Sequence, residues 1–370
     1  MLTSVMGEAT QSPGARIVGA STVRVWSLTS TARLERSFRR MNLAADGPSV
    51  VIVHQGWVYD EALIGALARR PGVVLLDSED RAVAAHVSAA TAEATAAALE
   101  LGETPAGLAP LSAAALLGDY NSDLRKKEPP VLERLTADNV REVERRLFQG
   151  SYKGVTDLVT KYWWPTPART VTRWCAAAGI SPNQVTFASL ILVLVALWQF
   201  WLGHFGLGLA AAWVMTFLDT VDGKLARVTL TSSKWGNIFD HGIDLIHPPF
   251  WWAAWVAGLQ AGTHPLSWPG AVLAVILGGY VAQRVFEGIF IGAFKIHVHA
   301  WRRFDSWFRL IAARRNPNLL LLTPATLLGR PDLGILLVAL WTAASLGVHL
   351  VQLIQASVAP RGAVVSWLAK

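Results

Sequence analysis

Four aspartates that lie close together in the sequence have the types and spacing that could do chemistry. Asp219 and Asp222 are three positions apart, and Asp240 and Asp244 are four positions apart. On two helices, these spacings place each pair on one helix face. If the two faces oppose each other, all four carboxylates converge. Such a cluster repels itself unless positive charge lies between the helices.

Residues near the aspartates indicate which ligands would meet there. Hard divalent cations prefer oxygen ligands, so we expect two ions of Mg²⁺ or Mn²⁺ among the carboxylates. Gly223, Ala226 and Gly236 leave room for a bulky ligand at the backbone, and Arg227 can hold a phosphate in fork geometry. The pattern predicts a two-metal site that handles phosphate groups.

The aspartates have two other interpretations. They could form ion pairs with Lys224, Arg227 and Lys234 at the helix ends, or line the pathway of a divalent-cation transport or binding protein. Carboxylates in this number at a membrane edge are functional by default, and a transporter would place them near the bilayer midplane. Both considerations favour phosphate chemistry.

The composition of the chain indicates where these residues lie. Of 370 residues, 52% are hydrophobic and only 16% are charged, which argues against a purely soluble protein. Asp, Glu, Lys and Arg are absent from residues 174–218, 245–283 and 333–360, lengths that suit helices crossing a bilayer. We expect a membrane all-α domain of six transmembrane helices, at about residues 185–203, 206–227, 236–259, 271–294, 313–329 and 333–357.

Basic residues set the expected orientation. Lys and Arg gather in the loops on one side, and the other side has only Arg330. We therefore expect a multi-pass protein of the cell inner membrane with both termini cytoplasmic. Residues 152–175 mix Trp and Tyr with Lys and Arg, which suits the headgroup layer. The net charge of +7 is scattered, so membrane lipids, not nucleic acid, are the expected partner.

The first part of the chain has a different pattern. Short β-rich runs alternate with helical stretches, which predicts a small soluble α/β domain over residues 1–118. Within it, the Ala-rich residues 82–101 are expected to form a plain surface helix. A charged linker and helix follow over residues 119–150, and the membrane domain with its juxtamembrane helix takes residues 151–370.

The aspartate motif resembles the signature of the CDP-alcohol phosphotransferase (CDP-alcohol phosphatidyltransferase) family. From Asp219 the chain reads Asp-x-x-Asp-Gly-x-x-Ala-Arg, then eight residues, then Gly-x-x-x-Asp-x-x-x-Asp, which ends at Asp244. All eight fixed positions match. Residues 181–186 are also similar to a segment that these enzymes carry before their first span. The resemblance covers about residues 150–357.

This resemblance implies transfer of a phosphoalkyl group from a CDP-alcohol to an acceptor hydroxyl, with release of CMP, in phospholipid or related phosphodiester biosynthesis. It implies a cytoplasm-facing polar cavity, CDP-diacylglycerol or a CDP-polyol as donor, an alcohol acceptor and a possible homodimer. It implies that Asp219, Asp222 and Asp240 bind metal, and that Asp244 shares the second metal and acts as general base. The residues lining the CDP site would be Gly223, Ala226, Arg227 and Gly236.

Other polar residues of the membrane half have two interpretations each. Arg284 and Glu287 could contact the polar group of the acceptor, or could neutralise each other. A basic loop follows, which could bind an acceptor phosphate or a lipid headgroup, or could be a plain interfacial loop. The residues in question are His297, His299, Arg302 and Arg303.

Residues 50–68 resemble the strand and following helix of sugar-phosphate nucleotidyltransferases. Such domains are fused to inositol-type CDP-alcohol phosphotransferases in some enzymes that make di-inositol phosphate. Two features that nucleotidyl transfer needs are missing here. Residues 25–33, where a Gly-rich phosphate loop should open the domain, contain no Gly, and residues 55–57 read Gln-Gly-Trp where a metal-binding Asp belongs. We expect a noncatalytic domain that binds or regulates.

Overall fold

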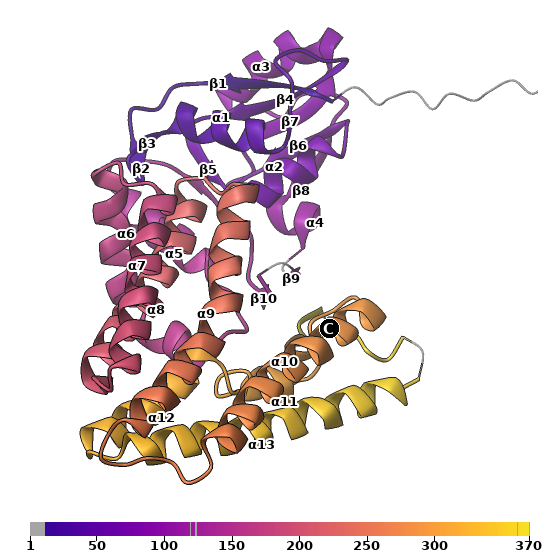
Figure 1. Cartoon of the computed structure of the whole chain (residues 1–370). Helices are drawn as coiled ribbons and strands as arrows, with labels where there is room; N and C mark the ends of the chain where they lie inside the picture. Colours follow the sequence, from indigo (N-terminus) through magenta and orange to yellow (C-terminus); the bar gives the residue numbers. More distant parts are fainter. Residues whose placement is uncertain (1–11, 119, 123, 361, 370) are drawn as a thin grey trace, which may run out of the picture. The chain divides into compact units, whose positions relative to one another are not determined.

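The computed structural model describes residues 12–118, 120–122, 124–360 and 362–369 (Figure 1). Among them the chain forms two compact units. The first unit comprises the residues up to 120 together with 128–150 and 228–230. The second unit comprises 121–127, 151–227 and the residues from 231 onward.

The first unit is a five-stranded mixed sheet covered by helices. The strands are β1 (Gly14–Val18), β4 (Ser49–His54), β6 (Val73–Leu76), β7 (Ala82–Ser88) and β8 (Ala109–Ser112), and the helices are α1 (Ser30–Arg40), α2 (Glu61–Ala68) and α3 (Ala92–Leu101). The strand order is β1, β4, β7, β6, β8, with β7 antiparallel to both neighbours. Val51 and Val53 of β4 pack with α1 and α2, whereas Ile52 packs with α3. Helices therefore cover both sheet faces, as expected for a small α/β domain.

The Ala-rich residues 82–101 do not form the single surface helix that their composition favours. Residues 82–88 are the central strand β7, and a helix begins only at Ala92. Every residue of β7 except Ser88 is buried, and β4 and β6 pair with its two edges. The helix prediction was wrong for residues 82–88 because pairing with strands on both sides outweighs the intrinsic preference of alanine for helix.

Shorter elements complete the first unit. β2 (Arg24–Val25) and β3 (Leu28–Thr29) form a hairpin, and its turn residues Trp26 and Ser27 have φ angles of 51° and 65°. Left-handed φ at both positions is what a type I′ turn requires. The strand β11 (Leu132–Arg134) pairs with β5 (Trp57–Tyr59), and α5 (Val140–Gly150) follows it. The short helix α4 (Ala113–Leu117) also belongs to this unit, whereas β9 (Tyr120–Asn121) lies at its boundary and β10 (Lys126–Lys127) belongs to the second unit.

The second unit is helical, and six of its helices lie where the six spans were expected. They are α7 (Pro182–Trp201), α8 (Phe205–Val228), α9 (Lys234–Gln260), α10 (Pro269–Phe294), α12 (Arg315–Leu327) and α13 (Pro331–Ser357). Among the described residues, α7, α8, α10 and α13 are long and apolar enough to cross a membrane. With 13 residues, α12 reaches only about 20 Å, short of a hydrocarbon core of about 30 Å. The unit is a membrane domain in which four of the described helices, rather than the expected six, are long and apolar enough to cross the bilayer.

An interfacial segment precedes α7. It contains the π-helical turn Val159–Trp163 and α6 (Pro165–Ala177). Tyr162, Trp163 and Trp174 are exposed there, which is typical of aromatic side chains at a membrane interface. Ser181 then caps α7 and forms a capping box with Gln184, so α7 starts with Pro182 in its first turn.

The helices α7 and α9 touch through their backbones at Gly258. A Cβ atom on Gly258 would lie 2.1 Å from the carbonyl oxygen of Phe200 and 3.1 Å from the Cα of Gly203. The Phe200 ring also packs edge-on against Trp251, with ring centroids 5.9 Å apart. In the same unit α10 lies along α13, and α12 also packs against α13 (Figure 1). Because α9 carries Asp240 and Asp244, the Gly258 contact fixes the helix that presents two of the four aspartates.

We expect Gly258→Ala to lower the free energy of unfolding by about 1–3 kcal/mol, because the added methyl group forces the two backbones apart. The matched control is Gly278→Ala in the interior of α10, where a Cβ atom meets nothing within 4 Å. Thermal unfolding of both variants in detergent micelles checks this. Equal midpoints for the two variants would contradict the close contact.

Candidate active site

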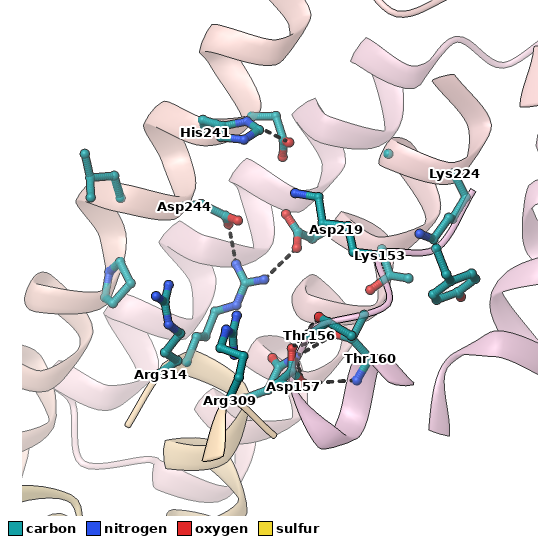
Figure 2. Close-up of a pocket in the computed structure, with 18 of the residues that line it drawn as sticks. Lys153, Thr156, Asp157, Thr160, Asp219, Lys224, His241, Asp244, Arg309 and Arg314 are labelled. Atoms are coloured by element: carbon teal, nitrogen blue, oxygen red, sulfur yellow. Dashed lines mark hydrogen bonds and ion pairs between the residues drawn. The ribbon is translucent and has the colours of Figure 1, made fainter. Parts of the chain in front are cut away.

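The eight motif positions of α8 and α9 all line two neighbouring cavities in the second unit. The larger cavity has a volume of about 370 Å³ and the smaller one about 140 Å³. The larger is lined by Asp219, Gly223, Arg227, Asp240 and Asp244, and the smaller by Asp222, Gly223, Ala226, Arg227, Gly236 and Asp240. Figure 2 shows residues that line the larger cavity. Two helical faces set by sequence spacing therefore do oppose each other.

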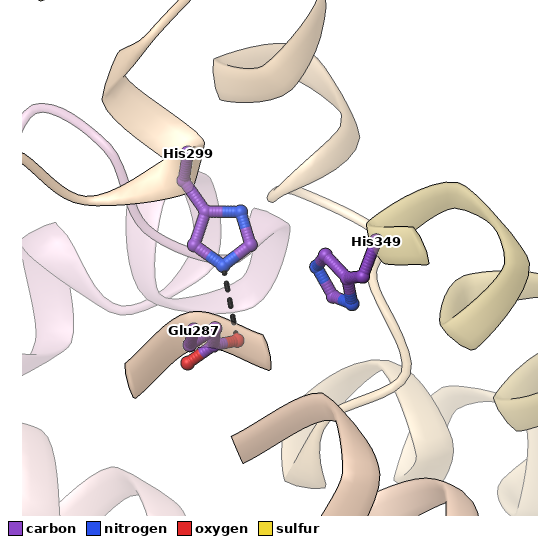
Figure 3. Close-up of side chains that lie close together, drawn as sticks. All are labelled: Glu287, His299 and His349. Carbon is purple, nitrogen blue, oxygen red and sulfur yellow. Dashed lines mark hydrogen bonds and ion pairs between the residues drawn. The ribbon is translucent and has the colours of Figure 1, made fainter. Parts of the chain in front are cut away.

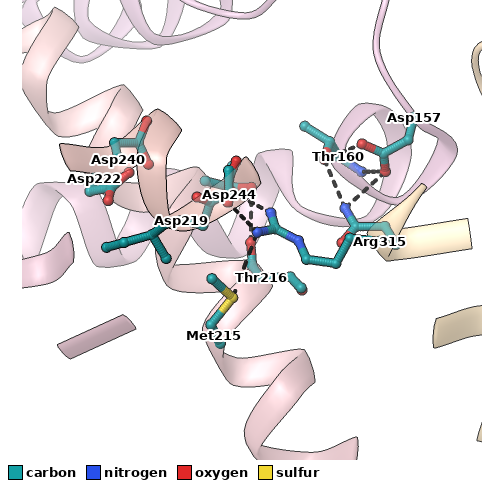
Figure 4. A network of polar contacts seen from close by, with 12 residues as sticks. Asp157, Thr160, Met215, Thr216, Asp219, Asp222, Asp240, Asp244 and Arg315 are labelled. Carbon is teal, nitrogen blue, oxygen red and sulfur yellow. Dashed lines mark hydrogen bonds and ion pairs between the residues drawn. The ribbon is translucent and has the colours of Figure 1, made fainter. Parts of the chain in front are cut away.

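Three of the four aspartates form a group that could hold a metal ion. Oxygen atoms of Asp219, Asp222 and Asp240 lie within 4.8 Å of one another (Figure 4). Thr186 donates a hydrogen bond to Asp222 Oδ2 at 2.6 Å, whereas Asp222 Oδ1 is buried without a partner among the described residues. A buried carboxylate oxygen without a donor is costly, and a hard cation would satisfy it. This donor set fits a divalent ion.

Asp244 joins the group through Arg315, a residue that the sequence analysis did not assign to the site. Arg315 Nη2 donates to Asp219 Oδ2 at 2.6 Å, and Nη1 donates to Asp244 Oδ1 (Figure 4). One guanidinium thus bridges aspartates of α8 and α9. The local sequence at the start of α12, Arg-Arg-Asn-Pro, does not by itself relate Arg315 to the aspartates.

The small residues and Arg227 have distinct surroundings. A Cβ atom on Gly236 would lie 2.9 Å from Asn183 Oδ1, so this glycine admits the start of α7. Gly223 is open, since the nearest atom to its added Cβ is Arg227 Nη1 at 3.7 Å. Arg227 donates to the Ser151 carbonyl at 3.3 Å and lines both cavities. Buried Lys224 donates to the same carbonyl at 3.1 Å.

Basic side chains that the motif does not include also line the larger cavity. They are Lys153, Lys224, Arg284, Arg309, Arg314 and Arg315. Burial, together with the positive charges of Arg125, Arg227 and Arg309, lowers the pKa of Lys153 to about 8. Burial opposes ionisation of Asp157, yet Arg309 and hydrogen bonds from Thr160 and Asn316 hold its pKa below the ordinary value. The cavity therefore has an acidic side and a basic side.

A second cluster lies behind the basic side, around Glu287 of α10. Arg284 donates to Glu287 Oε2 at 3.2 Å, Arg314 donates to Oε1, and His299 Nε2 lies 3.3 Å from Oε1. Figure 3 shows His299 beside Glu287, with His349 of α13 close by. Arg284 therefore pairs with Glu287, as one of its two interpretations had it, and it also lines the cavity, while its contact with an acceptor stays a prediction. Two arginines on one carboxylate disfavour an added cation at this cluster.

The residues of the basic loop after α10 lie in different surroundings. His299 is buried in the Glu287 cluster, whereas Arg302 pairs with Asp305 of α11 (Arg303–Phe308) through bonds of 2.9 and 3.0 Å. Arg303 is exposed and does not line either active-site cavity. His297 likewise does not line them.

Comparison with known proteins identifies a family to which the part of the chain that carries the motif is similar. A model of the CDP-alcohol phosphatidyltransferase family matches residues 179–361, which include every motif position. Residues 12–118 of the first unit lie outside that match, and their resemblance to nucleotidyltransferases stays a prediction.

Individual relatives cover only parts of the chain. Cholinephosphotransferase 1 of Xenopus laevis is 26% identical over 190 residues, 47% of this chain and 40% of that protein. Archaetidylinositol phosphate synthase of Pyrococcus horikoshii is 27% identical over 177 residues, 47% of this chain and 84% of that protein. An uncharacterized CDP-alcohol phosphatidyltransferase class-I family protein of Schizosaccharomyces pombe is 30% identical over 105 residues, 25% of this chain and 26% of that protein.

Arg315→Gln should lower the free energy of unfolding in EDTA. Removing one partner of a buried pair costs about 3–5 kcal/mol, and the effect should fall at or below the lower end because Asp244 is 40% exposed. Millimolar Mg²⁺ should recover part of the loss, since a cation can then neutralise the two aspartates. Thermal unfolding of the full chain in detergent, with and without Mg²⁺, checks this.

The control is Arg330→Gln, which removes an exposed arginine paired with Asp332 away from both cavities. It should change the midpoint little in either condition. A wild-type midpoint for Arg315→Gln in EDTA would show that Arg315 does not neutralise the pair.

Proposed function

Because residues 179–361 belong to the CDP-alcohol phosphatidyltransferase family, we propose that the second unit transfers a phosphoalkyl group from a CDP-alcohol to an acceptor hydroxyl and releases CMP. The observation that carries this proposal is the convergence of all eight motif residues on two neighbouring cavities. A divalent-cation transporter is disfavoured, since the family and the relatives are transferases.

We assign the donor to the side of the cavities formed by the small residues. Gly223, Ala226 and Gly236 line the smaller cavity, and Arg227 lines both. The Arg227 guanidinium suits the donor diphosphate because its N–H groups match phosphate oxygens in fork geometry. The donor is CDP-diacylglycerol or a CDP-polyol, and either presents the same diphosphate to Arg227.

The aspartates are the residues that would hold two Mg²⁺ or Mn²⁺ ions. The orphaned Asp222 Oδ1 and the clustered oxygens of Asp219 and Asp240 support this assignment, and Asp244 would share the second ion. When bound, such ions neutralise the diphosphate and stabilise the departing CMP. Thr186 orients Asp222 for this role through its bond to the opposite oxygen.

We assign the general base to Asp244. Its side chain is 40% exposed, lines the larger cavity and is held by Arg315. The acceptor oxygen forms a bond to the phosphorus of the phosphoalkyl group while the bond from that phosphorus to the CMP oxygen breaks. Asp244 takes the proton of the acceptor hydroxyl.

The membrane setting completes the proposal. Four apolar helices make the chain a membrane protein. We propose that it lies in the inner membrane with both termini cytoplasmic, because the Lys-rich and Arg-rich loops favour that side. Membrane lipids would surround it, and a homodimer stays a prediction.

Purified full-length protein should release CMP from CDP-diacylglycerol or CDP-inositol in the presence of an acceptor alcohol, and only with Mg²⁺ or Mn²⁺. The reason is that clustered carboxylates repel a diphosphate unless cations lie between them. A coupled assay for CMP, with a panel of alcohols and product identification, tests this. Turnover in EDTA equal to that in Mg²⁺ would sink the two-metal assignment.

Asp244→Asn should reduce kcat by at least about 100-fold while the fold and donor binding persist, because it removes the base and keeps the side-chain shape. Asp219→Asn should instead weaken metal-dependent donor binding. Asp138→Asn, at an exposed aspartate of the first unit, is the control. Normal turnover in both active-site variants would show that the chemistry lies elsewhere.

The isolated first part of the chain, residues 1–150, should not make a CDP-alcohol from CTP and a phosphorylated alcohol. Residues 25–33 form a hairpin and the start of α1 without a glycine, and β4 ends in His54, followed by Gln55, where a metal-binding Asp is needed. Robust formation of a CDP-alcohol by this fragment would make the protein bifunctional instead.

A further inference from the structure

We propose that Arg33 and Arg36 of α1 are positioning residues for the donor. They hold the connection between α8 and α9, and through it they keep Arg227 in place for the donor diphosphate. This inference rests on the proposed function, since it concerns the donor that the smaller cavity would bind. It also gives the noncatalytic first unit a role in the reaction.

The connection between α8 and α9 is the segment that both arginines contact. Residues Val228–Leu230 belong to the first unit and are buried. The helix α8 ends at Val228, and α9 begins at Lys234. The connection therefore joins the two halves of the motif, of which the first ends at Arg227 and the second begins at Gly236. A movement of this connection would displace motif residues on both of its sides.

The two arginines bind the backbone of the connection. Arg33 Nη1 donates to the Val228 carbonyl at 2.7 Å, and Arg36 Nη1 donates to the Thr229 carbonyl at 2.7 Å. The arginines are three positions apart on α1, so they extend from one face of that helix. The last carbonyls of a helix have no partner within it and carry partial negative charge, which guanidinium donors match. Both bonds are therefore charge-assisted and stronger than bonds between neutral groups.

Burial makes this contact important for Arg33 itself. Burial lowers the pKa of Arg33 to about 10, and the charges of Glu61 and Asp60 offset only part of this effect. A buried guanidinium is costly unless its N–H groups find acceptors. The Val228 carbonyl is such an acceptor, so the side chain and the end of α8 stabilise each other.

The conformation of Leu230 indicates that the connection needs this support. The Thr231 N–H donates to the Ala226 carbonyl at 2.9 Å, and Leu230 between them has a φ angle of 54°. This is the arrangement of a Schellman motif, in which glycine usually takes the left-handed position. A leucine there is strained and persists where surrounding contacts fix the backbone. The arginine contacts lie directly before it, so their loss should let the turn relax.

The first unit holds α1 firmly. Leu34 and Phe38 of α1 belong to the same hydrophobic cluster as Val51 of β4. Thr29 caps the helix by accepting a hydrogen bond from the Ala32 N–H at 3.2 Å. Because the arginines extend from a helix that packs on the sheet, they offer the connection a fixed support.

The residues on either side of the buried segment line the smaller cavity, which we assign to the donor. They are Arg227, Thr231, Ser232, Ser233 and Gly236. Asp244, by contrast, follows Gly236 by eight residues and lines only the larger of these two cavities. A loosened connection should therefore impair donor binding more than the chemical step.

Donor binding without turnover tests the arginines directly. The full chain in nanodiscs of phosphatidylcholine is titrated with CDP in the presence of Mg²⁺ by isothermal titration calorimetry. Arg33→Gln combined with Arg36→Gln should weaken CDP binding about tenfold or more, because two charge-assisted bonds are lost. Arg33→Lys combined with Arg36→Lys should recover part of the affinity, since an ammonium group still donates to a carbonyl.

The matched control is Arg39→Gln, which changes an exposed arginine of the same helix. Arg39 donates to the Glu35 carbonyl of its own helix at 3.4 Å. This variant should bind CDP like wild type.

Hydrogen exchange shows where the effect arises. Peptides that cover residues 226–236 should exchange faster in the double Gln variant, whereas peptides from β4 and β7 should exchange as in wild type. Unchanged exchange in the two strands shows that the first unit stays folded. If the double variant does not fold, Arg36→Gln alone provides the comparison, because Arg36 is only partly buried.

Turnover distinguishes positioning from stability. The KM for the donor should rise about tenfold or more in the double Gln variant, with kcat within about threefold of wild type. A role in stability alone would lower the amount of active protein, and with it the apparent kcat, while the donor KM stayed the same.

The outcomes separate this inference from the proposed function. CDP binding that depends on the two arginines, without CMP release from any donor, would refute the proposed function and leave the positioning role standing. Wild-type CDP affinity and donor KM in the double Gln variant would overturn the positioning role and leave the proposed function standing. A lower apparent kcat with an unchanged donor KM would also overturn the positioning role. Failure of the wild-type chain to bind CDP would overturn both.

Discussion

Neutralising the aspartates of α8 and α9 is the constraint on which the second unit depends. Carboxylates in apolar surroundings are stable only with positive charge or hydrogen-bond donors beside them. Arg315 provides charge to Asp219 and Asp244, and Thr186 provides a donor to Asp222. The aspartate cluster therefore contacts the start of α12 through Arg315 and the first turns of α7 through Thr186. A cation that enters the cluster competes with the protein's own Arg315 for the same oxygens.

The larger cavity has carboxylates on one side and basic side chains on the other, so its two sides attract ligands of opposite charge. The acidic side suits cations that accompany a diphosphate, and the basic side suits an anion without any metal. Asp157 lines the same cavity and accepts from Thr160 and Asn316, whereas Glu287, which does not line it, accepts from Arg284 and Arg314. Because Glu287 pairs with Arg284 and Arg314, these two guanidinium groups are held by a carboxylate other than the aspartates of α8 and α9.

The close packing of α7 against α9 and the aspartates of α9 lie in different halves of that helix. Close backbone contact at Gly258 and the aromatic cluster around Phe200 lock α7 to α9 at one end, while Asp240 and Asp244 lie in the first half of α9. Rigid packing at one end thus holds the polar half of the helix in place at the other. The first unit has its own sheet and its own hydrophobic clusters.

The sequence by itself determined everything that rests on local spacing and composition. The uncharged stretches predicted the positions of the six helices, and the spacing of the aspartates and their neighbours predicted the eight residues that line the cavities. It could not determine long-range partners. Arg315 lies 96 residues from Asp219, and nothing in the local pattern relates them. Tertiary structure also decided the strand β7, whose alanines favour helix until β4 and β6 pair with both edges, and the basic side of the cavity. Charges from several segments meet there only because the chain brings distant helix ends together.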